Sequence, residues 1–206
     1  MDMNDSIFCY KQAFNKAKSF SLEEGFLNGG IDDFEVCKKL HGEKLYNQAV
    51  KTYWGFMEKI HGVKAPGQCV TYSYWFMKEL REKGIPCYLT FGYVKITDKM
   101  GSKLCFKHEL DYIRRIARQE EPLDNINIHA WITFPDFSIM DISFLDSYVT
   151  INGLGKSNCF YYKGFSGDFK IGGEFPGVGL EELELKFFPT VVGEAFAEKC
   201  LVKKIL

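Results

Sequence analysis

A helix with both ends marked in the sequence is followed directly by a strand, and this order limits the folds open to the chain. The helix is expected from Gln68 to about Lys83, where Gly84 and then Pro86 end it in the usual order. Residues Tyr88 to Ile96 alternate and are rich in aromatic and β-branched side chains, which is typical of a strand. Gly92 within this strand indicates a bulge or a close approach of another backbone. These elements predict a mixed α+β fold.

The regions on either side add helices before this unit and a hairpin after it. Apolar residues at helical spacing predict a helix from Glu43 to Ile60, stopped by His61-Gly62 and followed by a turn at Ala65-Pro66-Gly67. Ser21-Leu-Glu-Glu24 resembles a capping box, which marks a helix start. The rest of the chain is expected to form a helix at about 107–120, strands at 127–134, 138–144, 160–165 and 183–188, and a short helix at about 194–202.

Composition excludes several classes of protein. The 206 residues fit a single domain, 1–206, in which 98–125 interrupts the pattern as an insertion. A net charge of −1 gives no broad electrostatic surface for nucleic acid or an anionic membrane, and no stretch is apolar enough to span a bilayer. The seven cysteines are dispersed without a C-x-x-C pair, and no His or Cys recurs at zinc-site spacing. We therefore expect a cytoplasmic protein without metal or cofactor, whose oligomeric state stays open.

Cys69 stands at the start of the expected helix. Free N–H groups and the helix dipole make that end positive, which favours a thiolate over a thiol. The same N–H groups can hold a developing oxyanion. Taken alone, Cys69 is equally well explained as a small buried hydrophobe.

His129 and Asp141 lie in the two halves of the expected hairpin. Alternation puts Ile128, Ala130, Ile132 and Phe134 on one face of the first strand, and places His129 and Trp131 on the other. Asp141 interrupts an apolar run, and a buried carboxylate is costly unless it is paired. The sequence therefore predicts that Asp141 has a partner.

The length of the hairpin loop decides whether that partner is His129. The two residues are 12 apart, so they share a face only if the loop has an odd number of residues. A three-residue loop, Pro135 to Phe137, pairs Phe134 with Ser138 and makes His129 and Asp141 diagonal neighbours. A two-residue loop would put them on opposite faces.

The order of these fragments resembles the transglutaminase-like superfamily, which is related to papain. The fragments are Gly67-Gln68-Cys69, Gly84-Ile85-Pro86, Phe91-Gly92-Tyr93-Val94, His129-Ala130-Trp131 and Asp141-Ile142-Ser143, and they cover a quarter to a third of the chain. The resemblance implies N-terminal helices, a central helix carrying the Cys, and an antiparallel sheet carrying the His and Asp. It departs at Cys87-Tyr88, Ile142-Ser143 and Val70, and the gap of 60 residues between Cys69 and His129 is long. Because of these departures, the substrate of the family, and its protein cross-linking activity in particular, are not inferred for this chain.

The resemblance implies acyl transfer through a thioester on Cys69, with His129 as base and Asp141 as its orienting group. We refer to these three residues as the triad. Related enzymes add an oxyanion donor from upstream, for which Gln68, Trp54 and Gln48 are candidates, and Trp131 is a candidate wall of the acyl pocket. A peptidase or amidase acting on a peptide or amide substrate is the first expectation. An amine acyltransferase and a non-catalytic binding module remain alternatives.

Overall fold

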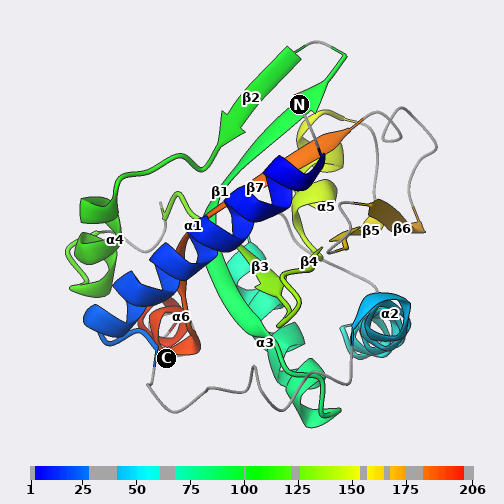
Figure 1. Ribbon diagram of the computed structural model, residues 1–206, viewed down its shortest axis with the longest axis horizontal. Helices are drawn as coiled ribbons and strands as arrows, with labels where there is room; N and C mark the ends of the chain where they lie inside the picture. The colour runs from blue at the N-terminus through cyan, green and yellow to red at the C-terminus, as the bar shows by residue number, and fades with distance from the viewer. Residues whose placement is uncertain are drawn as a thin grey trace.

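The computed structural model describes residues 3–27, 41–60, 68–99, 101–121, 126–153, 157–164, 168–174 and 183–201 (Figure 1). Within these residues the chain forms six helices around a curled, seven-stranded antiparallel sheet. The helices are α1 (Met3–Glu23), α2 (Gly42–Lys59), α3 (Cys69–Glu82), α4 (Leu110–Ala117), α5 (Phe144–Ile151) and α6 (Glu194–Leu201). The strands are β1 (Tyr88–Asp98), β2 (Gly101–Cys105), β3 (His129–Thr133), β4 (Ile139–Asp141), β5 (Asn158–Lys163), β6 (Phe169–Glu174) and β7 (Glu184–Val192).

The mixed α+β class is confirmed, and each expected strand and helix has a counterpart except the helix expected to start at Ser21. Three elements were not foreseen: β2, α5 and β6. The capping box at Ser21 was wrong as a helix start, because Ser21 lies in the last turn of α1 and its hydroxyl donates to the Ala17 carbonyl. The expected helix stop and turn at 61–67 lie outside the described residues.

Strand β1 organises the sheet because it pairs with three other strands. On one edge, Thr90 to Thr97 pair with β7. The other edge is divided: Tyr88 to Gly92 pair with β3, and Val94 to Asp98 pair with β2. Strands β4, β5 and β6 then follow β3 in that order. As a result, the end of β2 and the start of β3 meet along one edge of β1, opposite its middle.

Gly92 lies at the point where that edge changes partner. The pairing of β1 with β7 shifts between Phe91 and Gly92, so that Thr190 is an extra residue on β7. A Cβ on Gly92 would lie 2.0 Å from the Phe188 carbonyl oxygen and 2.9 Å from the Trp131 ring. The bulge and the close backbone approach predicted for this glycine are both confirmed.

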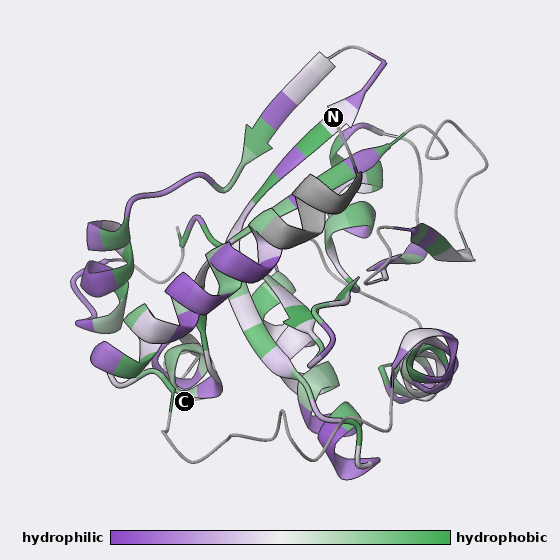
Figure 2. Ribbon diagram, viewed as in Figure 1, coloured by the Kyte–Doolittle hydropathy of each residue, from purple (hydrophilic) through white to green (hydrophobic). Residues whose placement is uncertain are grey.

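The sheet buries a different set of side chains on each face. Ala130 and Ile132 of β3 belong to a core shared with α2, α3 and α6, whereas Trp131 belongs to a core shared with α1. The alternation predicted for this strand is therefore confirmed. Figure 2 shows hydrophobic residues along the central strands and hydrophilic ones on the outer side of α4. Among the described helices, none has an apolar stretch long enough to cross a membrane.

The segment 98–125 supplies β2 and α4. Helix α4 is held to the residue that follows α1 by an ion pair in which Arg114 donates to Glu24 at 2.8 Å. Arg115 pairs with Glu121 at 2.6 Å and with Asp111 at 3.2 Å. Both arginines thus have acidic partners within the chain, which suits a solvated helix surface.

Candidate active site

The loop between β3 and β4 has three residues, the odd length that places His129 and Asp141 on one face. Phe134 and Ser138 close it through a backbone hydrogen bond of 2.9 Å, which leaves Pro135 to Phe137 as the loop. Phe137 has a φ of 64°, the left-handed conformation expected at the end of a three-residue hairpin loop. Pairing of Ile132 with Met140 then puts His129 and Asp141 on one face, as predicted.

The Asp141 carboxylate uses its two oxygens for different purposes. One, Oδ2, lies 2.6 Å from Nε2 of His129. The other, Oδ1, accepts the backbone N–H groups of Ser143 and Phe144 at 2.9 and 3.0 Å. These N–H groups stand at the start of α5, where the helix dipole also favours a negative charge. The partner that a buried Asp141 required is therefore His129, together with the first turn of a helix.

Each member of this pair shifts the pKa of the other. Burial lowers the pKa of His129, but the charge and hydrogen bond of Asp141, together with Cys69, outweigh burial, and the net pKa is raised. Burial raises the pKa of Asp141, whereas His129 and the two backbone N–H groups lower it, and the net pKa is lowered. Because both side chains are almost fully buried, the Asp141 carboxylate strongly stabilises the imidazolium that forms when His129 takes up a proton.

Cys69 lies beside this pair because side chains of α3 form hydrogen bonds with backbone carbonyls along one edge of β3. Strand β4 pairs with β3 only at Ile132 and Thr133. The carbonyls of Ala130 and Ile128 instead accept hydrogen bonds from Ser73 Oγ at 3.0 Å and Cys69 Sγ at 3.5 Å. Cys69 is the first residue of α3, one position nearer the helix start than expected, so its N–H is among those without a carbonyl inside the helix.

The thiol and the imidazole are neighbours, although they are not hydrogen-bonded in this arrangement. Nδ1 of His129 is buried and has no hydrogen-bond partner among the described residues. Cys69 is nevertheless close enough to contribute to raising the pKa of His129.

Three aromatic rings enclose His129. Trp131 stacks near one face, with ring centroids 6.0 Å apart, and Phe106 stacks on His129 at 5.2 Å. Phe144 meets the ring edge-on at 5.4 Å. His129 is consequently 1% exposed, and Cys69 is 9% exposed.

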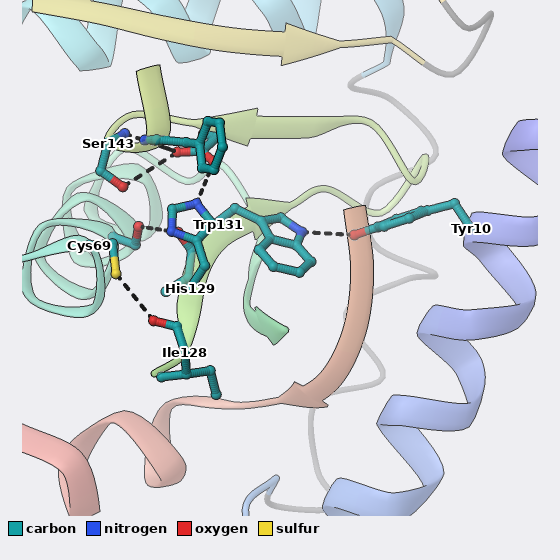
Figure 3. A network of polar contacts seen from close by, with 10 residues as sticks. Tyr10, Cys69, Ile128, His129, Trp131 and Ser143 are labelled. Atoms are coloured by element: carbon teal, nitrogen blue, oxygen red, sulfur yellow. Dashed lines mark hydrogen bonds and ion pairs between the residues drawn. The ribbon is translucent and has the colours of Figure 1, made fainter. Parts of the chain in front are cut away.

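A chain of buried hydrogen bonds ties Trp131 to α1 (Figure 3). The indole N–H donates to the Tyr10 hydroxyl at 3.0 Å, and that hydroxyl lies 2.7 Å from the Thr133 hydroxyl. Thr90 of β1 continues the chain at 2.8 Å. Neither Tyr10 nor Phe106 was foreseen as a site residue, because each reaches the site from a segment with no motif of its own.

The remaining candidates differ in position. Gln68 adjoins Cys69, and its side-chain oxygen accepts the Thr71 hydroxyl at 3.1 Å, which leaves its amide N–H groups for other partners. Trp54 is 41% exposed and packs edge-on against Tyr53, while Gln48 is exposed on α2. Among the described residues, no hydrogen bond or ring contact joins Trp54 or Gln48 to the triad. Trp131 borders His129 as proposed, but its N–H is committed to Tyr10.

Two further features bear on what the site can bind. A hollow of about 680 Å³ lies between the start of α2 and the β3–β4 loop, and none of the triad residues lines it. Within the described part of the chain, no group of three His, Cys, Asp or Glu side chains is arranged to hold a metal ion.

The chain was compared with protein-family models, with curated proteins and with solved structures, and none of the three comparisons gave a match.

Proposed function

We propose that this chain is a cysteine-nucleophile amide hydrolase of the transglutaminase-like, papain-related type, acting on a peptide or amide substrate through a thioester on Cys69. The observation that carries the proposal is the buried His129–Asp141 pair at 2.6 Å beside the first residue of a helix, Cys69. A buried ion pair is costly to build, so its place next to a thiol supports a chemical use.

The mechanism follows from the direction of each hydrogen bond. Nε2–H donates to Asp141, which leaves Nδ1 of His129 directed to the thiol side as the proton acceptor. Cys69 loses its proton to Nδ1, and the thiolate attacks the substrate carbonyl while the C–N bond breaks. His129 returns the proton to the leaving amine, and water then releases the acyl group by the reverse steps. The raised pKa of His129 suits it to act as the acid in the first half.

The oxyanion is assigned to the N-terminus of α3. The Cys69 N–H is the first donor, as in a helix-terminus anion site. Gln68 is the second donor, because Thr71 fixes its oxygen and leaves its NH₂ group able to turn toward the acyl group. Trp54 is a weaker candidate in view of its exposed position on α2.

One observation favours a non-catalytic binding module instead. Cys69 is 9% exposed and its thiol bonds to the Ile128 carbonyl, as expected of a cysteine that only fills space. The two candidates differ in the reactivity of the thiol, which can be measured without knowing the substrate.

Limiting iodoacetamide followed by peptide mass spectrometry tests the proposal. At about pH 6, an activated Cys69 reacts faster than the exposed Cys9, and His129→Ala removes that advantage. Cys87 is an internal reference for an inert thiol, because burial raises its pKa to about 12. If Cys69 reacts no faster than Cys87, the hydrolase proposal fails and the binding module is preferred.

A further inference from the structure

The triad is closed to solvent, so one of the groups around it has to move before any acceptor can reach the acyl-enzyme. The acceptor, water or an amine, must approach Nδ1 of His129, because that atom takes its proton. Nδ1 is buried without a hydrogen-bond partner among the described residues, and three rings surround the imidazole. Whichever ring moves away from His129 sets the size of the acceptor that can reach the acyl group.

Two of the three rings are fixed by the fold. Trp131 is fully buried, its N–H is bonded to Tyr10, and its ring tip lies against Gly92. Phe144 is 4% exposed, and its backbone N–H is one of those held by Asp141. Displacing either ring would disturb the residues that orient His129.

Phe106 is held in a different way. It follows β2, a strand whose residues 101–104 are exposed and whose described pairing is to β1 alone. Its side chain is half-buried, and its φ of 63° is a left-handed conformation that few non-glycine residues adopt. It reaches His129 because β2 ends where β3 begins, on the shared edge of β1.

His108 secures the backbone of Phe106. Burial lowers the pKa of His108, so the ring is neutral, and the Phe106 carbonyl fixes the proton on Nδ1, which donates to it at 2.7 Å. Nε2 lies 2.9 Å from the hydroxyl oxygen of Thr190, on the bulge of β7, and that hydroxyl donates to the Phe91 carbonyl. Phe106 thus lies at the margin of the core, half-buried, where it covers His129 and is held by His108.

We propose that Phe106 is the residue that sets acceptor size for the triad: a small displacement of its ring from His129 admits water and the smallest amines to acyl-Cys69, and the ring excludes bulkier ones. This inference rests on the proposed function and deepens it, since it explains why the triad would hydrolyse rather than transfer. In the step concerned, the acceptor nitrogen or oxygen bonds to the thioester carbonyl carbon and the C–S bond breaks. The acceptor proton passes to Nδ1 of His129 and from there to the Cys69 sulfur.

The test uses an acetyl group placed on Cys69 by p-nitrophenyl acetate. After the reagent is removed, intact mass spectrometry follows loss of the acetyl group in buffer alone, with methylamine, or with benzylamine. In the wild type, benzylamine should add little to the rate in water. In Phe106→Ala, the ratio of the benzylamine rate to the methylamine rate should rise by about tenfold or more, the discrimination typical of a steric wall.

Three further variants make the result specific. Phe106→Leu keeps an apolar side chain and should raise the ratio less; it also serves if Phe106→Ala does not fold, as judged by circular dichroism. His108→Ala releases the cover without altering its ring and should change the ratio in the same direction as Phe106→Ala. Leu104→Ala, an exposed change on the same strand, should leave the ratio at the wild-type value.

The outcomes separate this inference from the function on which it rests. An unchanged ratio in acetylated Phe106→Ala, or an equal rise with water and with both amines, would overturn the role of Phe106 while leaving the triad intact. Absence of acetyl-Cys69 in the wild type and every variant would instead overturn the proposed function itself.

Discussion

Replacing Asp141 by Asn should disable the site while leaving the fold nearly unchanged, because the structure determines which way the new amide faces. In Asp141, Oδ1 accepts two backbone N–H groups, from Ser143 and Phe144. An N–H group can donate only to an acceptor, and the amide oxygen is the acceptor of an Asn side chain. The Asn oxygen must therefore take the Oδ1 position. The Asn NH₂ then faces Nε2 of His129 and donates to it.

That reversal changes the tautomer of His129. An Nε2 that accepts a hydrogen bond carries no proton, so the neutral ring carries its proton on Nδ1. Nδ1 is the atom that must receive the proton of Cys69, and in the variant it is already occupied. The same substitution in a Ser-His-Asp triad lowers turnover by about 10⁴-fold, or about 5 kcal/mol, and we expect a loss of that order here.

The stability effect should be much smaller than the kinetic one. Removing one partner of a buried ion pair costs about 3–5 kcal/mol, but Asn keeps hydrogen bonds at both of its ends. The unfolding free energy of Asp141→Asn should therefore fall by only about 1–3 kcal/mol. Urea unfolding measures this value, and acetylation of Cys69 by p-nitrophenyl acetate measures the kinetic loss.

Asp146 provides a matched control. It is also a buried aspartate whose Oδ1 accepts a backbone N–H, that of Cys159 at 2.8 Å, and the Ser157 hydroxyl at 2.6 Å. Asp146→Asn should lose stability without a comparable loss of Cys69 reactivity. The nitrogen chemical shifts of the His129 ring should show that the proton has moved from Nε2 to Nδ1 in Asp141→Asn, and that it stays on Nε2 in Asp146→Asn. Reactivity within about tenfold of the wild type in Asp141→Asn would refute the tautomer argument.

Other changes follow from the same geometry. Because the pKa of folded His129 is raised and that of Asp141 lowered, the stability from the pair should be fully present between about pH 4 and 6.5. It should fall as the pH rises toward the pKa of His129 or drops toward that of Asp141, as urea unfolding of the wild type against Asp141→Asn would show. Tyr10→Phe leaves the buried Trp131 N–H without its acceptor and should cost about 1–3 kcal/mol in urea unfolding. Gly92→Ala places a methyl group against the β7 backbone and should cost about 1–3 kcal/mol or more by thermal unfolding.

The sequence predicted the parts of the site that depend on parity and local chemistry. Side chains alternate along a strand, so an even separation and an odd loop were enough to put His129 and Asp141 on one face. Gly92 was also interpretable, because a glycine inside a strand usually marks a close approach. Both inferences needed only the period of a strand, and the structure agrees with both.

The sequence could not predict features that depend on distant pairing. Ser21 was interpreted as a helix start, yet it ends α1, where its hydroxyl accepts the Val192 N–H of β7. The apolar run of α5 from Phe144 has no period that distinguishes a helix from a strand, so the second hairpin strand was drawn too long. Phe106 approaches His129 only because β2 and β3 share one edge of β1, which no local pattern records.

Asp141 joins the predictable and the unpredictable parts of the site. The sequence showed that a carboxylate in an apolar run needs a partner, but the structure gives it two, His129 and the start of α5. Because the α5 backbone fixes one oxygen, the other cannot turn away from His129, and the tautomer of the imidazole is set by a helix rather than by side-chain contacts alone. A substitution that shifts the start of α5, such as Ser143→Pro, removes one of those N–H donors and should lower Cys69 reactivity without touching any triad side chain. The orientation of His129 thus depends on the backbone at the start of α5, and it should be lost when that backbone is displaced.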